Sequence, residues 1–198
     1  MITKEETVFM VSGYMRTGTS MMMRALEAGG LEVVARESRD DYRKKFADEY
    51  YDPNEGGLYE LERKDYQAVG FPRAYKGKLI KCLMAGRANI AVVPKIKIVF
   101  MRRDFEEIRQ SYQAFFDQDF AANEENFIKS VEINIEQLQN RKDCDLKVFW
   151  YRDVVADPRK HFEILKNDGW PIDVEKATAI VDPELCRFRK EILTHGIV

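Results

Sequence analysis

The chain is poor in cysteine and histidine and has no long apolar run. Its three cysteines are odd in number and far apart, which excludes a disulfide framework and fits no metal-ligand spacing. With two histidines and no cluster of histidine with aspartate or glutamate, we expect no bound metal. No apolar stretch approaches the roughly 20 residues that span a bilayer, and the N-terminal residues are not typical of a secretion signal. These absences predict a cytoplasmic protein without a membrane partner.

The charges are nearly balanced, because 32 Lys and Arg residues stand against 34 Asp and Glu residues, for a net charge of −2. That balance excludes an extended basic surface, so we expect no nucleic-acid partner. A length of 198 residues fits one compact domain with a sizeable core, and we predict a single domain over 1–198. Nothing in the sequence indicates an oligomeric state.

Apolar runs and helical patterns alternate along the chain. The predicted strands cover 7–12, 31–35, 78–83, 97–102 and 146–151, and the predicted helices cover 18–29, 38–50, 58–68, 104–119, 123–140, 158–167 and 173–181. Strands that alternate with helices favour a parallel sheet covered on both faces. The sequence therefore predicts an α/β fold, a single three-layer domain with a mostly parallel sheet and helices on both faces.

The most informative segment joins the first predicted strand to the first predicted helix. The apolar run ends at Gly13, and a loop with Arg16 and Gly18 follows. Amide groups at a helix N-terminus bind phosphate or sulfate, and the guanidinium group of Arg16 matches tetrahedral oxyanions. The Gly13-x4-Gly18 spacing is that of nucleotide-hydrolysing loops, but Thr19 stands where those loops have lysine. The segment indicates a P-loop type of nucleotide-binding domain; the alternative is an ordinary glycine turn.

A similar arrangement occurs later, over residues 97–112. A β-branched and aromatic run ends in Arg103, and a helical pattern that carries Ser111 follows. Arg103 leaves the carboxyl end of a strand, where ligands of open α/β sheets bind, and Ser111 lies about two helical turns further on. The two side chains could share one phosphate, although a surface arginine and a helix-face serine are also common.

The first loop resembles the 5′-phosphosulfate loop of the sulfotransferase family, which reads K/R-S/T-G-S/T-S/T after a strand. The matching residues are Arg16, Thr17, Gly18, Thr19 and Ser20. The resemblance implies that these residues bind the 5′-phosphosulfate of 3′-phosphoadenosine 5′-phosphosulfate (PAPS), with Arg16 gripping it. It also implies that no metal is needed. The pattern is most similar to that of small bacterial and heparan-type members.

The later segment resembles the family's 3′-phosphate signature, R-D/N-P-x-D/E-x-x-x-S. Arg103 and Ser111 stand in its first and last positions, and Asp104 and Glu107 also match. Phe105 departs from the signature because proline is usual there, and the loss of proline weakens the helix start more than the chemistry. The resemblance implies that Arg103 and Ser111 bind the 3′-phosphate of PAPS.

Two further segments resemble parts of the family that hold the nucleotide. Tyr151 takes the place of a tyrosine that contacts adenine, and Arg152 replaces the usual glutamate beside it. In the basic tail, Arg187, Arg189 or Lys190 would help to hold the nucleotide, and we take Arg189 as the candidate. Two alternatives stay open: a core aromatic at a strand end for Tyr151, and solvated basic residues for the tail.

Sulfuryl transfer to a hydroxyl group needs a base that takes the acceptor's proton. The stretch 77–84 resembles the family's K-T-H strand; it keeps the lysine as Lys81 but lacks the histidine. The stretch 52–60 resembles the N-P-x-G-F/Y-x-E motif of bacterial and heparan-type members, which makes Glu60 the candidate base. Lys81 would neutralise charge on the sulfuryl oxygens. The plainer alternatives are a solvated glutamate and a strand-end lysine.

These features together predict a PAPS-dependent sulfotransferase that acts on a hydroxyl or amine of a small-molecule or carbohydrate acceptor. Its catalytic residues would be Glu60, Arg16 and Lys81. One alternative is a P-loop small-molecule kinase, against which Thr19 in the lysine position argues. The other is a non-catalytic nucleotide-binding protein, which the missing histidine keeps open.

Overall fold

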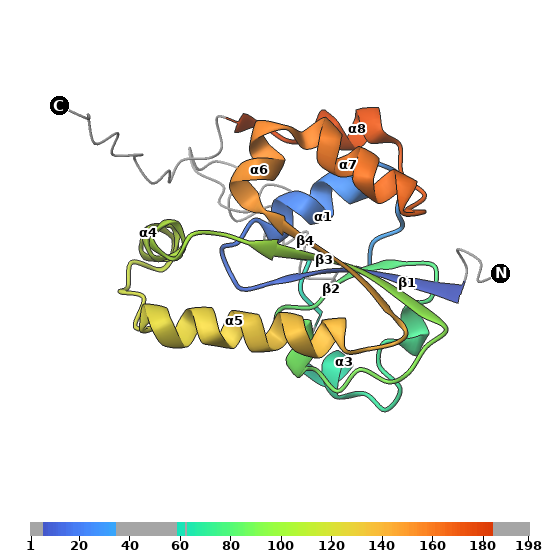
Figure 1. Ribbon diagram of the computed structural model, residues 1–198, viewed down its shortest axis with the longest axis horizontal. Helices are drawn as coiled ribbons and strands as arrows, with labels where there is room; N and C mark the ends of the chain where they lie inside the picture. Colours follow the sequence, from blue (N-terminus) through green and yellow to red (C-terminus); the bar gives the residue numbers. More distant parts are fainter. Residues whose placement is uncertain (1–5, 35–58, 62, 184–198) are drawn as a thin grey trace.

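A four-stranded, all-parallel sheet organises the molecule in the computed structural model, which describes residues 6–34, 59–61 and 63–183 (Figure 1). The strands are β1 (Thr7–Gly13), β2 (Leu79–Lys81), β3 (Lys95–Arg102) and β4 (Cys144–Trp150), in the spatial order β2-β1-β3-β4. Every residue of the central strand β1 is buried, as expected for a strand that is covered on both faces. Because the strands are parallel, their carboxyl ends meet at one edge of the sheet.

Helices cover both faces of this sheet. They are α1 (Thr19–Ala28), α3 (Arg63–Gln67), α4 (Phe105–Phe116), α5 (Glu124–Gln139), α6 (Tyr151–Ala156), α7 (Pro158–Asn167) and α8 (Val174–Thr178), with short 3-10 helices η2 (Arg73–Tyr75) and η3 (Ala85–Arg87). In Figure 1, α1, α6, α7 and α8 lie on one face, α3 and α5 lie on the other, and α4 lies at the end of the sheet where β3 finishes. The predicted three-layer α/β fold is therefore confirmed.

Two apolar clusters fill the space between the sheet and its helices. The cluster under α1, α7 and α8 includes Phe9, whose ring lies 5.1 Å from that of Trp170. The cluster under α5 includes Met10 and Phe127. Strand β1 contributes to both clusters because successive side chains of a strand point to opposite faces. This packing fixes the carboxyl end of β1, from which the candidate site is built.

The predicted strand 31–35 is wrong over its described residues, 31–34. There, Val33 forms an isolated parallel bridge with Leu79, and the amide of Leu79 donates to the carbonyl of Glu32 at 2.7 Å. The neighbouring strand β2 is three residues long, so it offers too short an edge for a further ladder. The segment therefore lies beside β2 without becoming a strand.

The predicted helix 58–68 is wrong at its start. Residues 59–61 are not helical, and α3 covers a shorter range further along the chain. The cause is an isolated parallel bridge between Glu60 and Lys81, which holds the backbone at position 60 against the edge of β2. The predicted helix 38–50 lies outside the described residues.

The predicted strand 146–151 ends one residue early. Tyr151 is the first residue of α6, a helix that the sequence analysis did not predict. A run rich in β-branched and aromatic residues continues from β4 into this helix, so the period of apolar residues does not mark the boundary. The chain leaves the sheet after Trp150, and Tyr151 is buried in the first turn of α6.

Candidate functional site

The loop between β1 and α1 has a backbone conformation that few residue types adopt. Arg16 has φ 65° and Gly18 has φ 89°, both in the left-handed region. The hydroxyl of Thr17 donates to the carbonyl of Tyr14 at 2.7 Å and closes the turn. A Cβ atom at position 18 would lie 2.3 Å from Cδ2 of Tyr151, so only glycine fits there.

Helix α1 begins directly after this loop, and within the part of the chain that the structure describes no side chain caps its N-terminus. Helix α4 begins differently, because the carboxylate of Asp104 accepts from the amide of Glu106 at 3.0 Å. This cap supplies the start signal that a proline at position 105 would have provided. The amides and the dipole of the first turn of α1, with Thr19 and Ser20, are therefore available to an anion.

Arg16 connects the loop to α4. Its Nε donates to the hydroxyl of Ser111 at 3.1 Å, and its guanidinium group lies 4.7 Å from the centre of the Phe115 ring. In the opposite direction, Nη1 of Arg103 donates to the backbone carbonyl of Arg16 at 3.1 Å. The two sequence motifs that carry Arg16 and Arg103 are thus brought together at the carboxyl ends of β1 and β3.

A nearly buried carboxylate lies between two arginines beside the loop. Glu107 accepts from Nε of Arg103 at 3.0 Å and from Nη2 of Arg152 at 3.4 Å. The side chains of Arg103 and Glu107 are 7% and 4% exposed, whereas that of Arg152 is 50% exposed. The guanidinium group of Arg103 also lies 4.4 Å from the centre of the Tyr151 ring. A buried carboxylate without such partners would be costly, because desolvation penalises an uncompensated charge.

Lys81, at the carboxyl end of β2, connects α1 with Glu60. Its ammonium group donates to Oε1 of Glu60 at 2.5 Å and to the hydroxyl of Ser20 at 3.1 Å. The Lys81 side chain is 3% exposed, and burial lowers the pKa of its ammonium group; Glu60 opposes that shift and Arg16 adds to it. Two of the predicted catalytic side chains therefore lie next to each other at the first turn of α1.

Several predicted nucleotide ligands have buried side chains. Thr17, Thr19 and Ser111 are buried, and Tyr151 is buried between Gly18 and the guanidinium group of Arg103. Any contact of positions 17 and 19 with a ligand would therefore come from the backbone amides. The tail candidate Arg189 and its neighbours lie outside the described residues.

Sequence reasoning did not assign three residues of this arrangement to the site. Glu107 was noted only as a match to a signature, although its spacing of four from Arg103 is that of a helical ion pair. Phe115 follows Ser111 by four residues, which places both on one face of α4. Arg152 gave no such signal, because the predicted strand 146–151 ends before it and no helix was predicted over residues 152–157.

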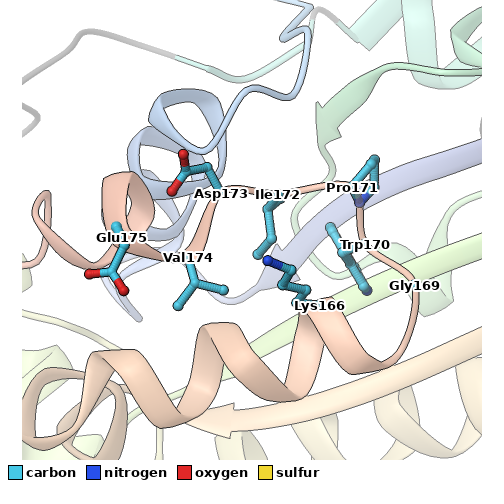
Figure 2. Close-up of a pocket in the computed structure, with 8 residues that line it drawn as sticks. All are labelled: Lys166, Gly169, Trp170, Pro171, Ile172, Asp173, Val174 and Glu175. Carbon is cyan, nitrogen blue, oxygen red and sulfur yellow. The ribbon is translucent and has the colours of Figure 1, made fainter.

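The described part of the chain forms a cavity and a shallow hollow near these elements. A cavity of about 130 Å³ adjoins the loop on the α5 side, and its lining includes Tyr14, Thr17, Arg103, Phe105, Phe127 and Trp150. A shallow hollow follows the connection from α7 to α8 (Figure 2) and is lined by Lys166, Gly169, Trp170, Pro171, Ile172, Asp173, Val174 and Glu175. The second hollow contains no predicted site residue and is separate from the site.

The arrangement as a whole is suited to binding an anion. Lys81, paired with Glu60, lies at the start of α1, and Arg103, paired with Glu107, bonds the loop that carries Arg16. The dipole of α1 also favours negative charge there. Among residues 6–34, 59–61 and 63–183, no group of three or more histidine, cysteine, aspartate or glutamate residues could hold a metal ion. Over the same residues, every helix is too short or too polar to cross a membrane.

Comparison with known proteins gives a fold and no sequence relative. The crystal structure of the sulfotransferase STF1 from Mycobacterium tuberculosis H37Rv is similar, with a TM-score of 0.54 and 14% sequence identity. The match covers 89% of this chain and 70% of that chain. No model of a protein family matches the sequence, and no curated protein does. At this identity the likeness shows a sulfotransferase-like fold.

Proposed function

We propose that this protein transfers a sulfuryl group from PAPS to a hydroxyl or amine of a small-molecule or carbohydrate acceptor. The observation that carries the proposal is the meeting of three features at one helix start: the uncapped N-terminus of α1, the cations Arg16 and Lys81, and the carboxylate of Glu60, which is 2.5 Å from Lys81. The sulfotransferase-like fold supports the same reaction class.

The donor's phosphosulfate would bind at the loop. Backbone amides from position 18 to position 20 and the hydroxyl of Ser20 supply hydrogen-bond donors, and Arg16 supplies a planar fork for tetrahedral oxyanions. As the sulfur–oxygen bond to the phosphate breaks, negative charge grows on the leaving phosphate. Donors already held in place, as here, stabilise that charge without reorganising.

Glu60 is the base in this proposal. The acceptor oxygen or nitrogen attacks sulfur, its proton passes to the carboxylate of Glu60, and 3′,5′-adenosine bisphosphate leaves. Lys81 stands between Glu60 and Ser20, where its ammonium group would neutralise charge on the sulfuryl oxygens during transfer. Adenine would lie near Tyr151, and the second phosphate near the α4 end of the site, beside Arg103 and Ser111.

The test has two parts, because binding and catalysis are separate claims. We expect 3′,5′-adenosine bisphosphate to raise the melting temperature without magnesium, since a ligand that binds only the folded chain stabilises it. If the melting temperature rises only with ATP and magnesium, and not with 3′,5′-adenosine bisphosphate, a kinase is favoured instead. Single-turnover transfer of labelled sulfate from PAPS to a panel of hydroxyl and amine acceptors then tests catalysis. Nucleotide binding without transfer to any acceptor would indicate a non-catalytic nucleotide-binding protein.

A further inference from the structure

The side chains of the 3′-phosphate signature are already engaged within the protein. Arg103 donates to Glu107 and to the carbonyl of Arg16, and its side chain is 7% exposed. Its flat face is covered by Tyr151. Ser111 is buried and accepts from Arg16. A phosphate that took Arg103 from Glu107 would remove a hydrogen-bonded cation from a buried carboxylate, which is unfavourable.

Arg152 differs from Arg103 in its exposure and in the length of its contact with Glu107. Its side chain is 50% exposed, and its contact with Glu107 is long, at 3.4 Å. A guanidinium group has five N–H donors in a rigid fork, and this single long contact engages only one of them. Glu107 keeps its 3.0 Å bond to Arg103 if Arg152 turns to another anion. Arg152 can therefore bind a phosphate without leaving a buried charge uncompensated.

Arg152 also lies at the correct end of the molecule. Glu107 bonds Arg103 through one carboxylate oxygen and Arg152 through the other, and Arg103 in turn bonds the backbone of Arg16. Figure 1 shows α4 and α6, which carry these groups, at the same end of the sheet. An anion on Arg152 and a second anion at the loop could therefore belong to one small molecule.

We propose that Arg152 makes the direct contact with the 3′-phosphate of the nucleotide and that Arg103 is a positioning residue, which holds the backbone of the Arg16 loop. The inference rests on the proposed function, because it takes the bound nucleotide to be a 3′,5′-bisphosphate. It changes the assignment of the second phosphate site from the signature arginine to an arginine on a different helix.

The experiment compares two nucleotides that differ only in the 3′-phosphate. The Kd values of 3′,5′-adenosine bisphosphate and 5′-AMP are measured by calorimetry for the parent and for Arg152→Ala. We expect the variant to lose about 10- to 100-fold in affinity for the bisphosphate, as for the loss of a hydrogen bond to a charged group, and to leave 5′-AMP unchanged. Arg152→Lys keeps the charge without the fork and is expected to fall between the two.

Two further variants make the result specific. Arg159→Ala removes an arginine of similar exposure, 52%, that is bonded to Glu175 on α8; it should change neither affinity. Arg103→Lys should loosen the loop and weaken both nucleotides by the same factor, which leaves their ratio unchanged. If Arg103→Lys lowers the ratio and Arg152→Ala does not, Arg103 is the direct contact and the inference is overturned.

The outcomes also separate this inference from the proposed function. A parent that prefers the bisphosphate, with an Arg152→Ala variant that keeps the same preference, overturns the inference and leaves the proposed function standing. A parent that binds neither nucleotide, or that binds both equally, overturns the two together. A melting-temperature scan of each variant confirms that the measured loss belongs to the site and not to the fold.

Discussion

At the scale of single residues, the ion pair between Lys81 and Glu60 is the feature closest to the proposed chemistry. Its lysine is buried and its glutamate is partly exposed, with 2.5 Å between the charged atoms. Oε1 of this carboxylate is bonded to Lys81, and in the proposed mechanism the buried Oε2 receives the proton of the acceptor. The same carboxylate compensates the ammonium group, whose pKa is lowered by burial.

We therefore predict that Glu60→Gln retains nucleotide affinity and loses about 10²- to 10⁴-fold in turnover, which is the usual contribution of general-base catalysis. The affinity is measured by calorimetry and turnover by single-turnover sulfate transfer. Glu32→Gln is the matched control, because Glu32 pairs with Lys78 at 2.7 Å in an exposed position. Turnover as fast as that of the parent would remove Glu60 from the mechanism.

A second prediction at this scale concerns Arg16. Its side chain is fixed by contacts with Ser111 and Phe115 on α4, and in the proposed function it binds the phosphosulfate on which charge grows. We expect Arg16→Ala to lose about 10²- to 10³-fold in turnover, as when a donor aimed at transition-state charge is removed, and to keep its fold. Circular dichroism checks the fold. Arg109→Ala, which removes an exposed arginine bonded to Glu106, should have parent activity; a parent rate in Arg16→Ala would show that Arg16 is misassigned.

At the scale of elements, the junction of the loop, α1 and α6 depends on a glycine. A Cβ atom at Gly18 would overlap the ring of Tyr151 at 2.3 Å, in addition to the strain of φ 89°. Gly30 has a similar backbone, with φ 102°, but nothing lies within 4 Å of its Cβ position. A comparison of alanine variants at Gly18 and Gly30 therefore separates the cost of backbone strain from the cost of steric overlap.

We predict that Gly30→Ala costs about 1 kcal/mol of unfolding free energy through backbone strain alone, and that Gly18→Ala costs about 1–3 kcal/mol more through overlap with Tyr151. Urea denaturation of the two variants measures both. In a Tyr151→Ala background, most of the extra cost should vanish. Equal losses for the two glycine variants would contradict the packing of α6 on the loop.

Elements with a strong apolar period could be predicted from the sequence, and elements that depend on tertiary contacts could not. β1, β3, α4 and α5 follow the predicted ranges closely, because each combines a clear period with a clear end. The segment 31–35 has strand composition, but the short edge of β2 limits it to a bridge. α6 begins with a tyrosine and contains two valines, so its composition suggests a strand.

The same limit applies to the candidate site. Spacing in the sequence indicated Arg16 and Arg103 as members of two motifs, and the fold brings these two residues together. Which donors remain available is a property of tertiary packing, and no local pattern reveals that Arg103 is covered while Arg152 is exposed. Residues 16 and 103 could therefore be found by pattern, whereas the division of tasks that we propose for Arg103 and Arg152 rests on their burial in the structure.

At the scale of the whole molecule, burial of titratable groups links stability to pH. Burial raises the pKa of the Cys82 thiol to about 12 and that of the Cys144 thiol to about 11, from an ordinary value of 9.0. The pKa values of Tyr14 and Tyr75 are also raised, mainly by burial. The pKa of Lys81 is lowered. Cys82, Cys144 and the two tyrosines therefore resist losing a proton in the folded state, whereas Lys81 releases one more readily there.

For the groups with raised pKa values, the unfolded chain loses protons first as the pH rises, so their stabilisation is complete below their unfolded pKa and is lost toward the folded value. Lys81 acts in the opposite sense and adds stability as the pH rises between its lowered value and about 10.4. The pKa of Lys147 is raised too, because the lowering by burial is outweighed by its bonds to Asp168 and Asp145. Since these five groups oppose Lys81, we predict that the unfolding free energy falls from about pH 8 upward, with about 1 kcal/mol of the loss by pH 10 coming from Cys82. Urea denaturation along this pH series measures the fall, and Cys82→Ala should flatten it more than Cys144→Ala does. A parent and a Cys82→Ala variant with identical pH profiles would show that the thiol at the end of β2 is not buried in solution.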